Sequence, residues 1–475
     1  MLGDLKDKLA PLGRLDVLQA IGDQALLHYA GDDLHRLDAA ALGRRARALR
    51  LIAEMARQRL DDRQALIGFE QAAATTAALL DQAPDSIERL QEHSASLDRL
   101  YELADGRGAF AAALDTRRDI AGLARRLAAL QPGNAQVHIE AIKSVRELAY
   151  MLNRANRSDE ALALLGQADA SASGLQAPPD KLREVLEEGH FPAGLVHATL
   201  GQQRQATAAF EACLAVMATD PSIAGDVWKR RMRANVQRGL AQSALGLGQW
   251  ARADRAASQA VHEFVLSGGD DAKNPMLAEE AIKDRLDLVR IQWQRGDASA
   301  EHAGLAEIEA AAARLPPVDP DRAEWHVRGR GNLLWLRAQL RPLTPALLTE
   351  LQAYVAALPY FERAGRMLTG SARYAAVDVA LALGDALALT GQPVPHWQQA
   401  TERTRAAAQA GVQAAINRRA LAQVRLGLTG VAGATAEARA SADRLQATDW
   451  RHPDLADLRR RLGLPALLLA SSQLP

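Results

Sequence analysis

The residues best suited to metal or nucleophilic chemistry in this chain are His190, His197 and its only cysteine, Cys213. The two histidines lie seven residues apart, which on a helix is two turns and ~10 Å along the axis. That is too far to share one ion without a third element between them. Cys213 falls at a core position of an amphipathic pattern, where a small buried side chain is expected. The sequence therefore predicts no metal site and no catalytic residue.

The phosphate-binding and hydrolase motifs that an enzyme would need are missing from the sequence. There is no Gly-x4-Gly-Lys-Ser/Thr loop, no Gly-x-Ser-x-Gly elbow, and Gly329-x-Gly331 lacks the third glycine of a dinucleotide fingerprint. The acidic pairs Glu187-Glu188 and Asp270-Asp271 are interpreted as solvated or capping charges. We therefore expect a non-enzymatic protein without a cofactor. An enzyme, or a nucleotide or nucleic-acid binder with a cryptic groove site, remains the alternative.

Composition favours helices packed closely on helices. Of the 475 residues, 48% are hydrophobic but only 4% are aromatic, so the core must rely on alanine and leucine. Basic and acidic residues both number 57, which gives no net attraction to nucleic acid or to a membrane. A single cysteine allows no internal disulfide, and the N-terminus does not resemble a secretory signal. These features predict a cytoplasmic location and no membrane partner.

The stretch from Met232 to Glu263 predicts the structural unit of the chain, two amphipathic helices joined by a turn at Gly248. Small residues line one face of each helix, so the two helices pack closely, but the pair needs neighbours to cover its flanks. Equivalent turns recur about every 47 residues. They fall at Leu60, Gly108, Asn156, Gly201, Gly248, Gly296, Thr344, Gly391 and Gly430.

A second set of helix breakers lies about half a period after each of these turns. Pro84-Asp85-Ser86, Pro132-Gly133-Asn134 and Asp220-Pro221-Ser222 are typical examples, and several place a capping residue before the next helix. The turns and the helix breakers alternate along the chain, and this spacing predicts helices of roughly 17 to 22 residues, or about 25 to 33 Å. The pattern is that of a helical-hairpin repeat.

Several repeats resemble the tetratricopeptide family. The resemblance rests on Ala206-x3-Phe210-x2-Cys213 after Gly194 and Gly201, on Trp250-x2-Ala253-x3-Ala257-x2-Ala260 after Gly248, and on Ala65-x3-Phe69-x2-Ala72. It is good from about residue 45 to residue 260 and weaker afterwards. The period exceeds the usual 34 residues because the helices are longer. The N-terminal sequence also looks like the repeat regions of large bacterial multidomain signalling proteins, downstream of kinase, cyclase or TIR-type output domains.

The tetratricopeptide resemblance implies that the first helix of each hairpin lines a concave groove for a peptide or protein partner. Basic side chains there would receive a carboxylate, and amides would pair with peptide backbone. By position, the groove candidates are Lys143, Arg146, Tyr150, Asn153, Arg154, Asn235, Arg238, Gln242, Lys283, Arg290 and Trp293. For each of them the alternative is an ordinary charge in an ion pair between neighbouring helices, which contributes little stability.

Taken together, the sequence predicts an all-α fold, a right-handed α-solenoid of about eight or nine hairpins. Its expected parts are an N-terminal helical cap (1–36), well-matched repeats (37–268), degenerate repeats (269–446) and a C-terminal capping helix and tail (447–475). The cap helix is expected near Asp454 to Leu462, and Arg459-Arg460-Arg461 on it would close the array or dock an acidic partner.

The predicted function is a protein- or peptide-binding scaffold or sensor in a bacterial signalling or regulatory system. A structural protein that self-assembles through its terminal repeats is a second alternative, and it would make the chain a homo-oligomer. Each hairpin is expected to contact only the next, so that the array forms an open curved rod.

Overall fold

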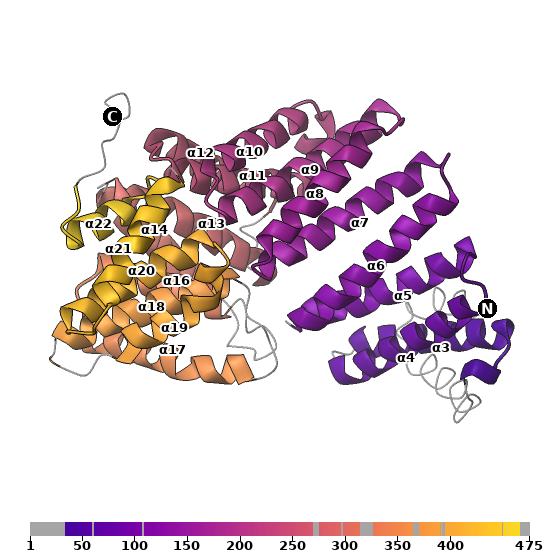
Figure 1. The fold of residues 1–475 in the computed structure, drawn as a ribbon, viewed down its shortest axis with the longest axis horizontal. Helices are drawn as coiled ribbons and strands as arrows, with labels where there is room; N and C mark the ends of the chain where they lie inside the picture. The colour runs from indigo at the N-terminus through magenta and orange to yellow at the C-terminus, as the bar shows by residue number, and fades with distance from the viewer. Residues whose placement is uncertain are drawn as a thin grey trace. The chain divides into compact units, whose positions relative to one another are not determined.

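The computed structural model describes residues 34–58, 61–106, 109–268, 275–295, 298–313, 326–363, 370–389, 391, 395–448 and 450–465. Within these residues the chain is helical and contains no β-strand (Figure 1). The expected N-terminal cap lies almost entirely outside them. The chain divides into two compact units, Met1–Leu148 and Ala149–Pro475.

The first unit is built from antiparallel helical hairpins. A short 3-10 helix, η2 (Leu34–Arg36), precedes the hairpins. The hairpin helices are α3 (Ala39–Gln58) with α4 (Asp62–Asp81), and α5 (Ile87–Gly106) with α6 (Phe110–Leu130). Small residues allow these helices to approach closely: a side chain at Gly68 of α4 would lie 2.8 Å from the Cβ of Ala53 in α3. The next helix, α7 (Ala135–Arg154), runs through the boundary between the two units.

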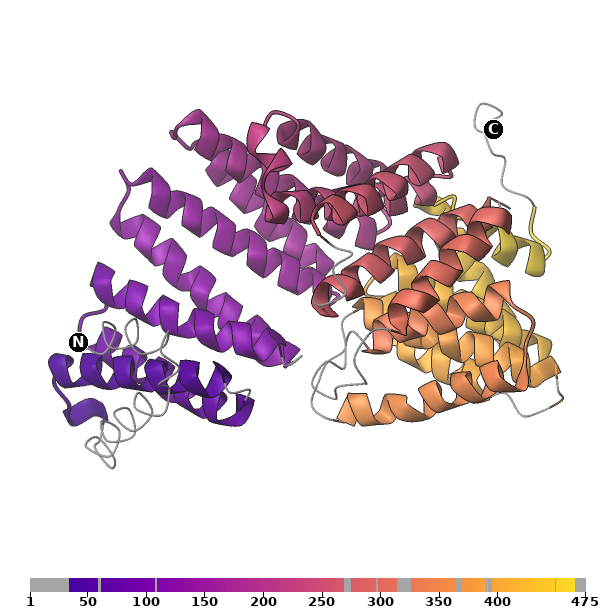
Figure 2. The same cartoon turned by 180° about the vertical axis from the view of Figure 1, so that it is seen from behind.

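The second unit continues the same hairpin pattern (Figure 2). Its helices are α8 (Ser158–Ser173); α9 (Pro179–Thr199) with α10 (Gln203–Met217); α11 (Val227–Gly246) with α12 (Trp250–Leu266); α13 (Pro275–Gln294) with α14 (Ala298–Ala312); α16 (Gly331–Leu340) with α17 (Pro345–Arg363); α18 (Gly370–Leu389) with α19 (Pro395–Gln409); and α20 (Gln413–Leu428) with α21 (Ala434–Ala447). A five-residue π-helical turn, η5 (His326–Arg330), precedes α16. The last helix, α22 (Pro453–Arg461), stands where the capping helix was predicted.

The predicted turn positions mark the hairpin turns that the structure describes. Five of them have a positive backbone φ: Asn156 (60°), Gly201 (77°), Gly248 (72°), Gly391 (71°) and Gly430 (82°). This left-handed conformation ends a helix, and glycine adopts it without steric cost. Thr344 acts differently, since its hydroxyl oxygen accepts a hydrogen bond of 3.2 Å from the backbone of Leu347 at the start of α17. Leu60, Gly108 and Gly296 lie outside the described residues. The helical-hairpin, tetratricopeptide-like fold is therefore confirmed.

Phe210 of α10 shows why the repeat motif has its small residues. Its ring is fully buried, and a Cβ placed on Gly194 of α9 or on Gly239 of α11 would lie 2.6 or 2.5 Å from it. The ring therefore fits between the two neighbouring first helices only because both positions are glycine. Cys213, one turn further along α10, is also buried in this core, as its place in the pattern predicts.

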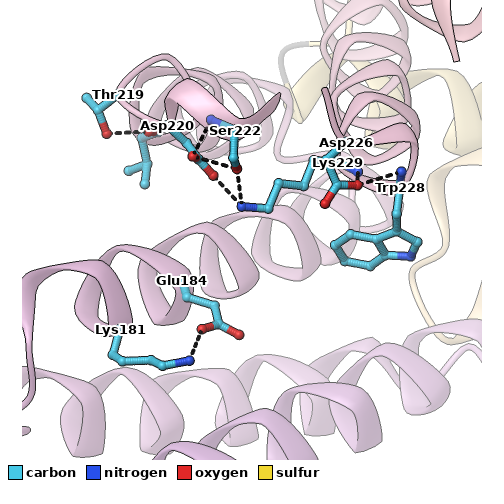
Figure 3. Close-up of polar contacts among 9 residues, drawn as sticks. Lys181, Glu184, Thr219, Asp220, Ser222, Asp226, Trp228 and Lys229 are labelled. Carbon is cyan, nitrogen blue, oxygen red and sulfur yellow. Dashed lines mark hydrogen bonds and ion pairs between the residues drawn. The ribbon is translucent and has the colours of Figure 1, made fainter. Parts of the chain in front are cut away.

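The connection from α10 to α11 is fixed by two aspartates (Figure 3). Asp226 caps α11, since its carboxylate accepts hydrogen bonds from the backbone of Trp228 and Lys229 at 2.8 and 3.0 Å. Asp220 likewise caps the short 3-10 helix η3 (Pro221–Ala224) and forms an ion pair with Lys229. The hydrogen bond from Lys229 lowers the pKa of Asp220 below its usual range. Trp228 itself stays exposed.

The second unit closes on itself, and in this it differs from the expected open rod. The backbone N–H of Arg451 donates to the carbonyl of Gly246 at 2.6 Å, and the Nε2 of Gln203 donates to the Oε1 of Gln413 at 2.7 Å. These contacts join residues more than 200 positions apart in the sequence. The start of α20 and the segment that precedes α22 thus contact the turns of the hairpins α9–α10 and α11–α12. The expectation that each hairpin contacts only its neighbours is wrong here.

Candidate functional site

The second unit contains a partly open cavity of about 1130 Å³, which we call the central cavity. Its walls come mainly from the first helices of successive hairpins, α13, α16, α18 and α20, and from α22. The lining includes Trp250, Arg290, Trp293, Trp335, Gln339, Asp378, Asp385, Asn417, Arg418, Arg425, Arg451, Asp454, Asp457, Arg459, Arg460 and Arg461. These helices present their inner faces to one space, as the resemblance implied for the concave groove.

Two arginine–aspartate pairs join α18 and α20 along one wall of the cavity. Arg418 bonds Asp378 through two nitrogens at 2.8 and 2.6 Å, and Arg425 bonds Asp385 at 2.6 and 2.7 Å. The pairs are seven residues apart on both helices, so the same geometry repeats after two turns. Such two-pronged pairs are stronger and better oriented than single contacts. They join the two helices along the wall and engage both carboxylate oxygens of each aspartate.

An aromatic wall faces the cavity from α13 and α16. The rings of Trp293 and Trp335 meet edge to face, with their centroids 5.9 Å apart. The guanidinium of Arg290 lies 4.7 Å from the centre of the Trp335 ring, within range of a cation–π interaction. Half-buried indole rings beside a cation provide a flat surface on which a side chain or a peptide plane could stack.

The first turn of α22 contributes a half-buried carboxylate, that of Asp454. Asp454 lies 3.7 Å from Arg290 and accepts a hydrogen bond of 3.2 Å from Asn417. Burial opposes ionisation of this carboxyl group, but His452, Arg290, Arg418 and the bond from Asn417 together lower its pKa. Asp454 is therefore charged at neutral pH and holds the closing segment against α13 and α20.

His452, two residues earlier, stacks on Trp450 with ring centroids 5.0 Å apart and an interplanar angle of 9°. Its Nδ1 accepts a hydrogen bond of 3.2 Å from the backbone N–H of Asp454, and His452 thereby caps the N-terminus of α22. Burial lowers the pKa of this imidazole to about 4. At neutral pH the ring is therefore uncharged, as the capping bond requires.

The charges of the central cavity are unequal in number. Seven arginines and four aspartates line it, which leaves a surplus of three positive charges. Two of the arginines, Arg460 and Arg461, stand on the last turn of α22 and both pair with Asp457. The side chain of Arg460 is 77% exposed. The cavity thus offers cations at an accessible edge as well as aromatic surface inside.

Of the predicted groove residues, Arg290 and Trp293 line the central cavity. Others lie in contacts between neighbouring first helices, which is the alternative that the sequence left open. Arg238 forms an ion pair with the buried Asp284, and Gln242 donates to Asp287 at 2.9 Å, both between α11 and α13. Asn235 accepts a hydrogen bond of 2.5 Å from Arg238. Lys283, next to Asp284 on α13, is partly buried.

The remaining candidates lie on α7. Arg146 is buried, with 3% of its surface exposed, whereas Tyr150 is exposed and Lys143 is partly so. Asn153 donates to the hydroxyl of Thr199 at 3.1 Å, and the guanidinium of Arg154 lies 5.7 Å from the ring centre of Tyr150. A role for this helix in partner binding stays a prediction.

Sequence reasoning missed the residues that close the cavity, above all Asp378, Arg418, His452 and Asp454. The seven-residue spacing shared by Asp378 and Asp385 and by Arg418 and Arg425 was a usable signal, because it puts each pair on one helical face. No signal in the neighbouring sequence indicated that residues 450–454 would contact α11 and α13.

Among the described residues no group of three or more histidine, cysteine, aspartate or glutamate side chains is arranged to hold a metal ion. His197 instead contacts Gln202, with 2.6 Å between Nδ1 and Oε1. In the described ranges no helix combines the length and hydropathy needed to cross a bilayer. The side chains of Glu187 and Glu188, and the residues Asp270 and Asp271, lie outside what the structure describes.

Comparison with known proteins gives structural likenesses only. No protein-family model matches the chain, and no curated protein matches it. A Rap protein complexed with competence and sporulation factor is 12% identical, with a TM-score of 0.45, and the match covers 80% of this chain and 97% of that one. The apo form of RapI is 9% identical, with a TM-score of 0.41 and coverages of 74% and 86%. A human IFIT1 dimer with PPP-AAAA is 13% identical, with a TM-score of 0.35 and coverages of 85% and 81%.

Proposed function

We propose that this chain is a non-enzymatic binding scaffold that holds an acidic peptide segment of a protein partner in the central cavity. The observation that carries this proposal is the combination of three tryptophans and a surplus of arginine in the lining of the central cavity. In a cell, such a scaffold would serve as the sensor or regulatory part of a signalling system.

The size of the cavity favours a peptide over a small metabolite. Sites for drug-sized ligands usually measure about 300 to 1000 Å³, and the central cavity exceeds that range. An extended peptide advances roughly 3.3 to 3.6 Å per residue and offers backbone groups throughout its length. Asn417 and Gln339 in the lining would pair with such groups.

The charge of the cavity favours acidic side chains over a nucleic-acid backbone. Asp378 and Asp385 would repel the closely spaced phosphates of a nucleic acid, which needs a larger positive surplus to bind. Separate carboxylates on a peptide would reach Arg460 and Arg461 at the edge of the cavity while avoiding the aspartates. Aromatic side chains of the same peptide would stack on Trp293 and Trp335.

The proposal is tested with a library of ten-residue peptides that carry Asp or Glu at alternate positions and one variable aromatic residue. Binding is followed by tryptophan fluorescence, since Trp250, Trp293 and Trp335 line the cavity. Peptides selected on the intact protein should lose about thirtyfold in affinity when Trp293→Ala is introduced, because buried aromatic anchors typically contribute ~2 kcal/mol or more. Arg460→Glu should weaken binding several-fold and reduce its salt dependence.

The matched control is Arg405→Glu on α19, an exposed arginine that pairs with Glu402 and does not line the cavity. It should leave peptide affinity unchanged. A further pair, Lys143→Glu with Tyr150→Ala, tests the predicted surface of α7 separately. Equal binding by the wild type and Trp293→Ala, or preference for a ten-nucleotide single strand over every peptide, would rule out the proposal.

A further inference from the structure

The turns of the hairpins α18–α19 and α20–α21 carry the most exposed large apolar side chains in the part of the chain that the structure describes. Leu389, at the end of α18, is 83% exposed, and Leu428, at the end of α20, is 78% exposed. Val431, in the turn after Leu428, is exposed too. Both leucines lie at the same edge of the second unit, because the Arg425–Asp385 pair joins α18 to α20 one turn before each of them. We call Leu389, Leu428 and Val431 the turn patch.

The turn glycines show which hairpin turns are covered by other parts of the chain. A Cβ placed on Gly201, in the α9–α10 turn, would lie 3.1 Å from the side chain of Gln413. A Cβ placed on Gly391 or on Gly430, in the turns that carry the turn patch, would meet no atom of the described residues within 4 Å. The early turn is therefore covered by a distant segment, whereas the described residues leave the two later turns open.

The sequence around the turn patch is free of formal charge. No Asp, Glu, Lys or Arg occurs between Asp385 and Glu402, or between Arg425 and Glu437. A surface that binds nucleic acid or an anionic membrane needs basic side chains, which these turns lack. Exposed apolar side chains that lie together on a protein commonly mark an interface with another protein. The turn patch therefore suits an apolar protein surface.

The hairpin α11–α12 offers such a surface at the end opposite to its turn. Val227 and Trp228 begin α11, and Val265 and Leu266 end α12. All four side chains are exposed, and Trp228 is 61% exposed. In Figure 3 the indole of Trp228 projects from the first turn of α11, and only the backbone of this residue takes part in the polar contacts drawn. We call these four residues the open-end patch.

Three of the four basic side chains in the first two turns of α11 are paired within the fold. Arg230 and Arg233 both form ion pairs with Glu263 of α12, at 3.2 and 2.6 Å. These pairs also hold the start of α11 beside the end of α12, so the open-end patch is one surface. Lys229 pairs with Asp220. Because these positive charges are used within the fold, the open-end patch favours an apolar partner over a membrane or a nucleic acid.

The fold already contains a contact in which the start of a helix is buried against a hairpin turn. The start of α20 lies against the α9–α10 turn, where Gln203 donates to Gln413 at 2.7 Å. Val412, which directly precedes α20, is 1% exposed as a result of its packing. The start of α11 is apolar as well, but its Val227 and Trp228 are exposed.

We propose that the open-end patch of one copy of this chain docks on the turn patch of a second copy. Trp228 would be the central anchor, packed against Leu389 and Leu428, since buried aromatic side chains dominate the binding energy of interfaces. The contact joins two different surfaces, so each copy keeps one patch for a further copy, and the assembly is head to tail. Both patches lie in the second unit, and this inference does not depend on the peptide site of the central cavity.

The test is light scattering of the full chain over a dilution series. The wild type should associate beyond a dimer as its concentration rises. Trp228→Asp removes the anchor of the open-end patch, and Leu389→Asp with Leu428→Asp removes the turn patch. Each of these variants alone should have its dissociation constant raised at least about tenfold, because each buries a charge in the interface. The matched control is Ile67→Asp, an exposed apolar side chain on α4 in neither patch, which should associate like the wild type.

A mixture of the two variants separates head-to-tail docking from other modes of association. Each variant retains the patch that the other has lost, so the mixture should form a one-to-one complex that does not grow further. Circular dichroism should show wild-type helical content for both variants. A wild type that stays monomeric, association that survives either change, or a mixture that stays monomeric would overturn the proposal. Binding of a monomeric wild type to phosphatidylserine vesicles would also overturn it, in favour of a membrane surface.

Discussion

At the scale of single residues, the closing segment depends on a histidine that must stay neutral. His452 is buried, stacks on Trp450 and accepts the capping bond of α22 through Nδ1. A proton on that nitrogen would remove the acceptor and place a third cation beside Arg290 and Arg418. Burial lowers the pKa of the imidazole from about 6.5 to about 4.

This shift predicts a loss of stability in mild acid. Between pH 6.5 and pH 4 the unfolded chain binds a proton that the folded imidazole does not, so the free energy of unfolding falls as the pH falls, by up to about 3 kcal/mol. His452→Gln keeps an acceptor but cannot titrate. Thermal unfolding at pH 7.5 and pH 5 should therefore show a larger drop in melting temperature for the wild type than for this variant. Parallel drops would contradict a neutral buried histidine.

At the scale of helices, polar pairs join the first helix of one hairpin to that of the next. Arg57 and Glu102 form such a pair at 2.9 Å between α3 and α5, and Arg238 pairs with Asp284 between α11 and α13. Arg418 and Asp378 repeat the arrangement between α20 and α18. Several charged side chains that could have bound another protein are therefore already paired within the fold.

We expect the Arg238–Asp284 pair to contribute to the stability of the fold more than to the binding of a partner. The side chains of Arg238 and Asp284 are 13% and 1% exposed, and burial raises the pKa of Asp284. Arg238→Ala would leave a buried, unpaired carboxyl group and should destabilise the second unit by about 3 kcal/mol or more. Urea unfolding measures this loss.

The double variant Arg238→Ala/Asp284→Ala serves as the control, because it removes the stranded carboxyl group and should recover part of that stability. An Arg238→Ala protein that unfolds like the wild type but binds selected peptides more weakly would instead support the groove role predicted from the sequence.

The sequence predicts helices and their turns well because those depend on local signals. Gly201 and Gly248 could be assigned to turns from helical periodicity and from the need for a left-handed residue. The cavity could not be predicted in the same way, because it depends on contacts between distant repeats. Gln203 and Gln413 are ordinary polar residues in their own helices, and only the fold brings them within 2.7 Å.

At the scale of the whole molecule, contacts between early and late hairpins make the second unit a closed array around the central cavity. In an open solenoid each repeat is stabilised by its neighbours alone. Here the turns of early hairpins contact the segment that precedes α22: a Cβ on Gly248 would lie 3.4 Å from the Cβ of Arg451. The central cavity exists only because these ends meet.

An engineered disulfide tests this closure most directly. Gly248→Cys with Arg451→Cys, in a Cys213→Ser background, places two Cβ atoms near the ~3.8 Å separation that disulfides prefer. The strain of a left-handed cysteine costs roughly 1 to 2 kcal/mol. The control is Gly430→Cys with Arg451→Cys, since Gly430 has a similar φ but no atom within 4 Å of its Cβ position. We predict that mild oxidation links only the first pair, seen by thiol titration and by peptide mapping. Two free thiols in a Gly248→Cys/Arg451→Cys protein of full helical content would contradict the closed second unit, and the central cavity with it.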